Sequence, residues 1–474
     1  MDDNYLLRRE IVKAFFSAEG GKDLIPEEGM YRARTMAEID RGTSGPRERK
    51  GHRSRVVIVA LFVALLFAAS LSLLVGPWSN VLPAPAPAGI SYTSHVNISI
   101  NGNAQFDNSL YPNNGVVSGN GTVSNPYIIE GWNISAAGAH GIRIQNTNAY
   151  FIVRDCYVHS GGTLYNGIYL FRSANGTLTN NNCSNNKYGI NLELLKGDTL
   201  TNNTCSSNTQ YGIRLYGSER NTLSGNNCSS NVLHGISVRT TSNNNTLSGN
   251  NCSSNGDLGI YLGTSSRNIV SNNTCSSNTQ YGIRLYTSGI NTLSNNTCSS
   301  NGIHGIYLDS STGNTVSNNT CSNDLYGIYL LASGSNRISR NQVYNSTSYG
   351  IDIFSGFNNR IWNNTFYHNN GSGDAYDQAK NQAHDSGGIN WWNSTNGYGN
   401  YWADWTIPDV AYRFEIVDLP YNITGTAGAK DYYPLTSPKV GAPPIPEFSE
   451  IVIPIVGLMM IALILGRARK KPLC

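Results

Sequence analysis

Seven cysteines recur through the middle of the chain at a nearly constant interval, and their chemistry has three interpretations. A thiolate column could bind a soft metal, neighbouring thiols could form disulfides, and buried thiols could serve as small apolar side chains. We favour burial, because tetrahedral metal sites need convergent ligands and a column presents sulfurs that all point the same way. Disulfides between neighbours stay an alternative, and we predict no metal site here. The cysteines are Cys183, Cys205, Cys228, Cys252, Cys275, Cys298 and Cys321.

A second periodic set of residues has side chains that could bind sugars. Each member stands two residues after a glycine, and aromatic rings alternate with charged groups along the set. Such a row could stack on sugar rings and form hydrogen bonds with their hydroxyls. The alternative is that tyrosine favours strand positions and packs along its own row. The predicted ligand-binding residues are Tyr169, Arg214, Tyr261, Arg284, Tyr307, Tyr329 and Asp352.

Acidic residues are too scattered in the repeats to predict a catalytic pair. Glycosidases need two carboxyl groups about 5–10 Å apart, which here requires two acids in one outward column on adjacent repeats. No such pair occurs between residues 160 and 355. We therefore name no catalytic residue and favour binding over catalysis, with a polysaccharide lyase or hydrolase as the alternative.

The repeats themselves predict the fold. A Gly-Ile pair keeps the same interval as the cysteines, and Leu or Val stands five residues before each cysteine. Segments such as Gly305–Leu308 alternate apolar and polar residues with a period of two, as short strands do. Three short strands in each 22–24 residues, with Asn, Ser and Gly between them, are typical of a parallel β-helix. The sequence predicts an all-β chain of about ten such coils.

An asparagine stands two residues before each of these cysteines. Stacked coils lie about 4.8 Å apart, so identical side chains form ladders along the axis. An amide both donates and accepts, and each asparagine can therefore satisfy the next. The predicted structural ladder comprises Asn181, Asn203, Asn226, Asn250, Asn273, Asn296 and Asn319.

Two apolar segments flank the repeats and predict membrane anchoring. The first has 20 uncharged residues, enough to span about 30 Å of bilayer, and basic residues lie just before it. Basic residues also follow the second segment, so we expect both termini in the cytoplasm and the repeats outside. The predicted order is a cytoplasmic segment (1–55), a transmembrane helix (56–75), a Pro/Ala-rich tether (76–94), an extracytoplasmic β-helix with caps (95–436), a linker (437–450), a second transmembrane helix (451–466) and a basic tail (467–474).

Charge excludes one class of partner. The whole chain has 33 basic and 30 acidic residues. Residues 1–55 hold 12 of the basic and 10 of the acidic residues, and the tail holds four more basic residues. Residues 56–466 therefore carry 17 basic and 20 acidic residues. A domain with so few cations is a poor binder of nucleic acid, whose affinity comes from neutralised phosphates.

The regions that flank the coils carry two further predictions. Residues 95–135 and 367–436 are expected to cap the array. Acidic residues in the second cap could bind a structural Ca²⁺, although a capping aromatic cluster is the favoured interpretation and we otherwise predict no cofactor. The external position also predicts N-glycosylation, with the better sequons at Asn97, Asn345, Asn370 and Asn393.

Residues 95–436 resemble the right-handed parallel β-helix superfamily, in particular NosD-like proteins with carbohydrate-binding and sugar-hydrolysis (CASH) repeats. Besides the repeats, the resemblance rests on the motifs at Pro126–Trp132, Gly399–Asp404, Pro420–Tyr421 and Asp431–Leu435. The resemblance implies a right-handed coil. The name-giving members of the family serve copper-site assembly, so the resemblance also raises that role for this chain. Copper favours Cys, His and Met, yet all five Met lie outside the repeats, so a copper-maturation factor is our third choice.

The C-terminal segment resembles a second family feature. Pro446-Glu447-Phe448, followed by an apolar helix and a basic tail, is similar to the PEF-type sorting signal of archaeal surface proteins. The resemblance implies processing by an archaeosortase. The sequence thus predicts a membrane-anchored surface protein whose external β-helix binds carbohydrate or cell-envelope material.

Overall fold

The computed structural model describes residues 91–405 and 415–438, and these residues contain the β-helix. The predicted membrane helices (56–75 and 451–466), the cytoplasmic segment and the PEF motif lie outside the described residues. Within the described ranges, no helix has both the length and the apolar character needed to cross a bilayer. Membrane anchoring and archaeosortase processing therefore stay predictions.

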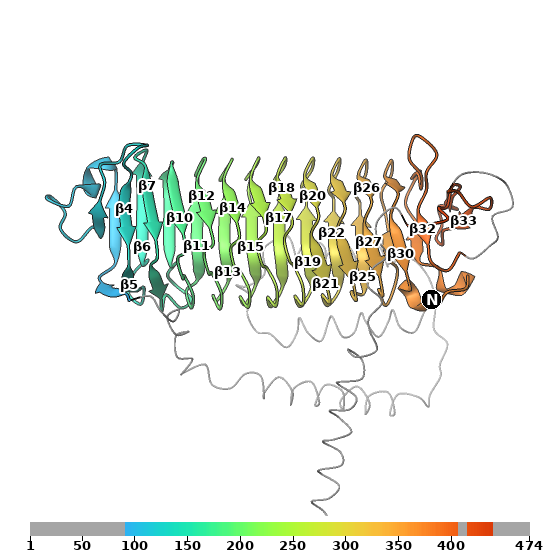
Figure 1. The fold of residues 1–474 in the computed structure, drawn as a ribbon, viewed down its shortest axis with the longest axis horizontal. Helices are drawn as coiled ribbons and strands as arrows, with labels where there is room; N and C mark the ends of the chain where they lie inside the picture. Colours follow the sequence, from blue (N-terminus) through green and yellow to red (C-terminus); the bar gives the residue numbers. More distant parts are fainter. Residues whose placement is uncertain (1–90, 406–414, 439–474) are drawn as a thin grey trace, which may run out of the picture. The chain divides into compact units, whose positions relative to one another are not determined.

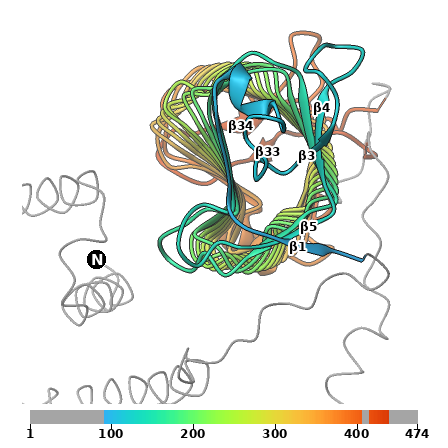
Figure 2. The same cartoon turned by 90° about the vertical axis from the view of Figure 1, so that its left-hand side faces the viewer.

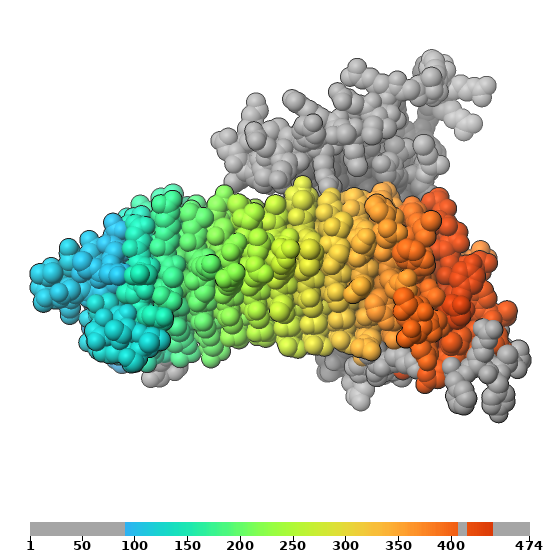
Figure 3. Space-filling view, turned by 90° about the horizontal axis from the view of Figure 1, so that it is seen from above, coloured from blue at the N-terminus to red at the C-terminus, as the bar shows by residue number. Residues whose placement is uncertain are grey.

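Parallel strands stack into sheets along one axis, as the repeat pattern predicts (Figure 1). The view along the axis shows the strands of successive coils superposed around a common interior (Figure 2), and in the space-filling view the coils follow one another as bands from the N-terminal to the C-terminal end (Figure 3). The prediction of a right-handed parallel β-helix of about ten coils is confirmed.

The first sheet, called the long-strand sheet below, contains all nine six-residue strands that the structure describes. Its order is β2 (Ile98–Asn101), β6 (Ile142–Thr147), β9 (Ile168–Ser173), β11 (Tyr188–Glu193), β13 (Tyr211–Tyr216), β15 (His234–Arg239), β17 (Leu258–Gly263), β19 (Tyr281–Tyr286), β22 (His304–Asp309), β25 (Tyr326–Leu331), β28 (Ile351–Ile353) and β31 (Ala383–Asp385).

The second sheet has strands of three or four residues. They are β3 (Val116–Ser118), β4 (Tyr127–Glu130), β7 (Phe151–Arg154), β10 (Gly176–Thr179), β12 (Thr199–Thr201), β14 (Thr222–Ser224), β16 (Thr246–Ser248), β18 (Ile269–Ser271), β20 (Thr292–Ser294), β23 (Thr315–Ser317), β26 (Arg337–Ser339) and β29 (Arg360–Trp362).

The third side of the coil is less regular. Isolated bridges replace strands in the coils between Asn182 and Thr274. The strands on this side are β1 (Thr93–His95), β5 (Trp132–Ser135), β8 (Tyr157–His159), β21 (Thr297–Ser299), β24 (Thr320–Ser322), β27 (Gln342–Tyr344), β30 (Thr365–Tyr367) and β32 (Tyr401–Trp402). A hairpin of β33 (Tyr421–Asn422) and β34 (Lys430–Asp431) and three 3-10 helices, η2 (Asn103–Phe106), η3 (Asn369–Gly371) and η4 (Gln378–Lys380), complete the described elements.

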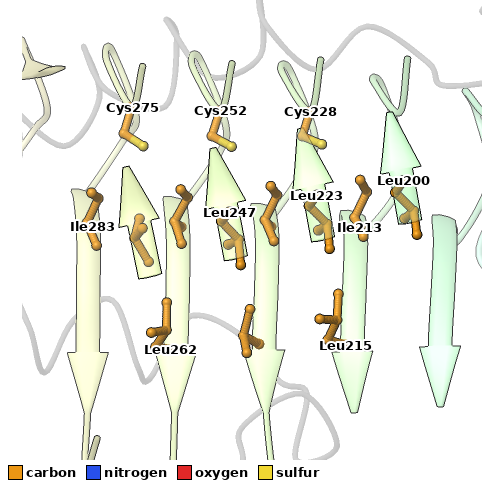
Figure 4. Packing of buried hydrophobic residues seen from close by; sticks show 14 of the residues in the cluster. Leu200, Ile213, Leu215, Leu223, Cys228, Leu247, Cys252, Leu262, Cys275 and Ile283 are labelled. Atoms are coloured by element: carbon orange, nitrogen blue, oxygen red, sulfur yellow. The ribbon is translucent and has the colours of Figure 1, made fainter. Parts of the chain in front are cut away.

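Apolar columns fill the interior because alternate residues of each strand point inward. Ile and Leu of the long-strand sheet face Leu and Val of the second sheet, and the cysteines close the third side (Figure 4). The structure places the seven predicted cysteines, preceded by Cys156, buried and free. Burial raises the pKa of the Cys228 and Cys252 thiols well above the ordinary value, so they remain protonated. Val343, Phe366 and Trp402 continue the column toward the C-terminus.

The predicted asparagine ladder is one of three. In each rung, the side-chain N–H and the backbone N–H donate to the Oδ1 of the next rung; for Asn250 and Asn273 both distances are 2.9 Å. A second ladder stands three residues after the cysteines and a third stands seven residues before them. Their members include Asn208, Asn231, Asn255, Asn278 and Asn301, and Asn221, Asn245, Asn268, Asn291 and Asn314.

Each ladder ends at a buried acid. Because every rung donates toward the C-terminus, the last rung has N–H groups without a further amide to accept them. Asp431 accepts from Asn400, Asp385 accepts from Asn390, and Asp324 accepts from both N–H groups of Asn301. Beyond Asp324, Asn369 donates to Gln382, which donates to Asp404. The carboxyl oxygens of these acids accept the N–H groups that no further amide can accept. Three of the acids considered for Ca²⁺ thus have a structural role, and Ca²⁺ binding stays a prediction.

Asp431 makes the stability of this end dependent on pH. Burial raises its pKa to about 7, against the hydrogen bonds from Asn400, Trp402 and Tyr433 that favour the carboxylate. An acid with a raised folded-state pKa stabilises the fold at low pH, and this contribution is lost as the pH rises through the folded-state value. Between pH 5 and pH 7 we expect the free energy of unfolding to fall by about 2 kcal/mol from this group.

Denaturant unfolding at several pH values measures this dependence. Asp431→Asn keeps an acceptor oxygen and cannot titrate. The free energy of unfolding of this variant should therefore lack the fall between pH 5 and pH 7 that is expected for wild type. An equal pH slope for both proteins would contradict the assignment.

Candidate functional site

The outward side of the long-strand sheet carries three parallel columns of side chains, which we call the aromatic face. Strand pairing places all seven predicted ligand-binding residues in its middle column. The complete column from β9 to β31 is Tyr169, Asn191, Arg214, Ser237, Tyr261, Arg284, Tyr307, Tyr329, Asp352 and His384.

Two flanking columns make the face wider than the predicted row. The first stands just before the glycines and includes Tyr188, Tyr211, His234, Leu258, Tyr281, His304 and Tyr326. The other lies two residues beyond the middle column and includes Phe171, Glu193, Tyr216, Arg239, Tyr286 and Asp309.

Several members of the middle column are less exposed than an outward row suggests. Tyr261 is 9% exposed, Tyr307 6% and Asp352 5%. Rings of adjacent columns pack on one another: Tyr307 meets the edges of both Tyr281 and His304, with centroids about 5 Å apart. The rings therefore pack against one another, as the packing interpretation predicts, and ligand binding stays a prediction.

Rings stack in two runs along the axis. In the first, Tyr188 stacks on Tyr211 with centroids 5.2 Å apart and planes 3° apart, and Tyr211 stacks on His234 at 4.8 Å. In the second, Tyr281 stacks on His304 at 5.0 Å, and His304 stacks on Tyr329 at 4.5 Å. Each run presents π-systems over several coils in one direction.

Arginines are interleaved with these rings. Arg214 lies 4.5 Å from the Tyr216 centroid and 5.4 Å from that of Tyr188. Arg239 lies 4.5 Å from the Tyr261 centroid. These distances are within the range of cation–π contacts, so the rings hold the guanidinium groups in place on the face.

Charge pairing differs among the arginines. Arg284 donates to Asp309 at 2.9 Å. Among the described residues, neither Arg214 nor Arg239 has a carboxylate within ion-pair distance; Arg214 donates to Asn191 at 3.3 Å and Arg239 to Ser237 at 2.9 Å. The first half of the face therefore presents positive charge that the protein does not neutralise directly.

Burial keeps the titratable rings of the face neutral. It lowers the pKa of His304 to about 3 and that of His234 well below its usual value. It raises the pKa of Tyr169 to about 12, with the neighbouring Glu193 acting in the same direction. At neutral pH these three rings are therefore uncharged.

The C-terminal end of the face contains a residue that the repeat pattern does not predict. His384 follows Asp352 in the middle column and its Nδ1 lies 2.7 Å from Asp352 Oδ1. The chain takes 32 residues instead of 22–24 to return to this column, which breaks the period. The alternation Ala383-His384-Asp385, with the first and third residues buried, is the signal that could have placed it.

The predicted glycosylation sites lie on the surface of the described β-helix but are not equally free. Asn97 donates its side-chain amide to the carbonyls of Ser135 and His140, and Asn370 donates to that of Asn381. Asn345 and Asn393 are half-exposed. Glycosylation stays a prediction at all four.

Metal binding finds little support in the described part of the chain. There, no group of three or more His, Cys, Asp or Glu side chains is arranged to hold an ion.

Comparison with protein families gives a match over most of the described β-helix. A family model described as periplasmic copper-binding protein (NosD) matches residues 88–256 and 239–406. No curated protein sequence matches the chain.

Solved structures with a similar course of the chain include three polysaccharide-modifying proteins. The A-module of mannuronan C-5 epimerase AlgE6 from Azotobacter vinelandii is 13% identical, with a TM-score of 0.48 over 56% of this chain and 83% of that chain. The periplasmic alginate epimerase AlgG is 16% identical (TM-score 0.35; 57% and 76%). The catalytic domain of a GH87 α-1,3-glucanase is 12% identical (0.37; 64% and 68%). At these identities the likeness concerns the fold alone.

Proposed function

The chain belongs to the NosD family, and we propose that this member binds an extended polysaccharide along its aromatic face. The observation that carries the proposal is the two runs of stacked rings with arginines interleaved among them over successive coils. The outer edges of these rings can contact sugar rings, and the polar groups between them can hydrogen-bond with hydroxyls.

The charge of the face favours an anionic chain. Arg214 and Arg239 have no ion-pair partner among the described residues, whereas Arg284 is paired with Asp309. A guanidinium can bind a carboxylate with two parallel hydrogen bonds. We infer that sugars with carboxylate groups bind over β13 and β15 and that neutral sugars bind more weakly there.

Substitution of Arg214 by glutamine tests this inference. The change removes the charge and the contacts with Tyr188 and Tyr216, so we expect affinity for polygalacturonate to fall about tenfold. Titration of the full-length protein, followed by tyrosine fluorescence, measures the affinity, with neutral dextran as the uncharged comparison.

Arg220→Gln is the matched control, because Arg220 lies exposed in a turn of the same coil, outside the aromatic face. Wild-type affinity is expected for this variant. The proposal fails if wild-type protein binds no polysaccharide, or if both variants lose affinity equally.

Copper, which the family description names, is not supported by the described side chains. Copper favours clusters of Cys, His and Met. The described cysteines are buried, with thiol pKa values raised by burial where a shift is resolved, and no cluster of ligating residues accompanies them in the described ranges. These residues do not fit a copper site, and we derive no copper chemistry from them.

A further inference from the structure

Three side chains at the C-terminal end of the aromatic face form a hydrogen-bonded chain that the binding proposal does not use. Ser386 Oγ lies 3.0 Å from His384 Nε2, and His384 Nδ1 lies 2.7 Å from Asp352 Oδ1. We propose that Ser386, His384 and Asp352 form a serine-nucleophile centre that cleaves carboxylic esters. The arrangement of hydroxyl, imidazole and carboxylate defines such a centre by geometry, whatever the order in the chain.

The fold holds these groups in place through the long-strand sheet. Asp352 and His384 are directly paired residues of β28 and β31. Ser386 stands two residues after His384 on the same outward side, and its backbone N–H donates to the carbonyl of Ile353 at 2.9 Å. The Tyr349 ring stacks on the imidazole with centroids 5.1 Å apart. Backbone pairing and ring packing thus fix both the histidine and the serine.

Burial decreases from the carboxylate toward the imidazole, as this chemistry requires. The Asp352 side chain is 6% exposed and the His384 side chain 20%, while Ser386 is half-exposed. A buried carboxylate that accepts from Nδ1–H orients the ring so that the lone pair of Nε2 faces the serine hydroxyl. The Thr426 N–H donates to Ser386 Oγ at 3.3 Å, which helps to fix the position of this hydroxyl beside the imidazole.

The reaction balances with water as the only co-reactant. Ser386 Oγ attacks the ester carbonyl carbon while its proton passes to His384 Nε2, and Asp352 stabilises the imidazolium that forms. The tetrahedral intermediate releases the alcohol, which takes that proton from Nε2, and leaves an acyl group on Oγ. Water, deprotonated by Nε2, then attacks the acyl carbon, and release of the carboxylic acid returns the proton to Ser386.

The side chains that follow Asp352 favour an ester with an apolar acyl group. Phe354 and Phe357, 55% and 61% exposed, follow Asp352 in the turn that precedes β29 and could contact an acyl chain. Because the centre lies on the aromatic face, O-acyl groups of a bound polysaccharide are the substrate class we infer. This last step rests on the proposed binding function, whereas the ester-cleaving chemistry does not.

Labelling of the full-length protein with a fluorophosphonate probe tests the nucleophile. We expect one labelled peptide containing Ser386, identified by mass spectrometry, and hydrolysis of p-nitrophenyl acetate. Ser386→Ala should abolish the label, and His384→Gln and Asp352→Asn should each slow labelling by about 100-fold or more.

Ser348→Ala, in the turn before Tyr349, is the control and should label as wild type does. Unchanged melting temperature of Ser386→Ala shows that the fold survives. Absence of the label in wild-type protein, or its persistence in Ser386→Ala, overturns the proposal. The outcome is separate from the binding function, since polygalacturonate binding without labelling refutes only the esterase, and labelling without binding refutes only the polysaccharide substrate.

Discussion

Substitution of Gly259 by alanine is expected to destabilise the β-helix by about 4 kcal/mol or more, through a clash between the added Cβ and backbone carbonyl oxygens. A Cβ at this position would lie 2.5 Å from the carbonyl oxygen of Gly282 and 2.9 Å from that of Cys252. Neither oxygen belongs to a flexible side chain, and the coils on both sides are held by parallel strand pairing. Relief of the clash would require separating two coils.

Denaturant unfolding of the full-length chain, followed by far-UV circular dichroism, measures this effect. Gly373→Ala is the matched control, because a Cβ there meets no atom within 4 Å and the backbone is not left-handed. We expect it to change stability by less than about 0.5 kcal/mol. A similar stability of Gly259→Ala and wild type would show that the coils are not packed as closely as described.

The columns of the repeat can be predicted from the sequence, because a residue's place in its column depends only on its position within the repeat. The interval between Cys252 and Cys275 alone sets the register between their coils, and a β-helix then aligns every other position. The long-strand sheet follows directly: Ile260 pairs with Ile283, and Tyr261 with Arg284. Two further asparagine ladders carry the same period. The prediction does not include them, because it considers only asparagines that stand two residues before a cysteine.

Lateral packing was less predictable. The pattern shows that Tyr307 points outward, but it does not show that Tyr281 and His304 cover its ring from the neighbouring column. Likewise, the long return between Asp352 and His384 conceals their pairing. Residues from one column are predicted by periodicity, whereas contacts between columns and across irregular coils depend on side-chain volume and loop path.

The asparagine ladders are expected to be as important for stability as the glycines, because their amides satisfy buried backbone groups. Asn273 is 1% exposed, and its side chain takes part in four hydrogen bonds. It accepts from the backbone and side-chain N–H of Asn250, both at 2.9 Å, and it donates to Leu247 O and Asn296 Oδ1, both at 3.0 Å. Asn273→Leu should reduce the free energy of unfolding by about 4 kcal/mol, although the two side chains have similar shapes.

The physical reason is the desolvation of groups that lose their partners. Leucine leaves the Leu247 carbonyl and the Asn250 amide buried without those bonds, and each such group costs about 1–3 kcal/mol. Asn272→Gly is the matched control: Asn272 is adjacent and exposed, and its φ of 56° suits glycine. The free energies of unfolding of the two variants, measured with denaturant, should therefore differ widely. Equal stability would mean that the interior is held by apolar burial alone, and that the ladders only follow the stacking that the Ile, Leu and Cys columns impose.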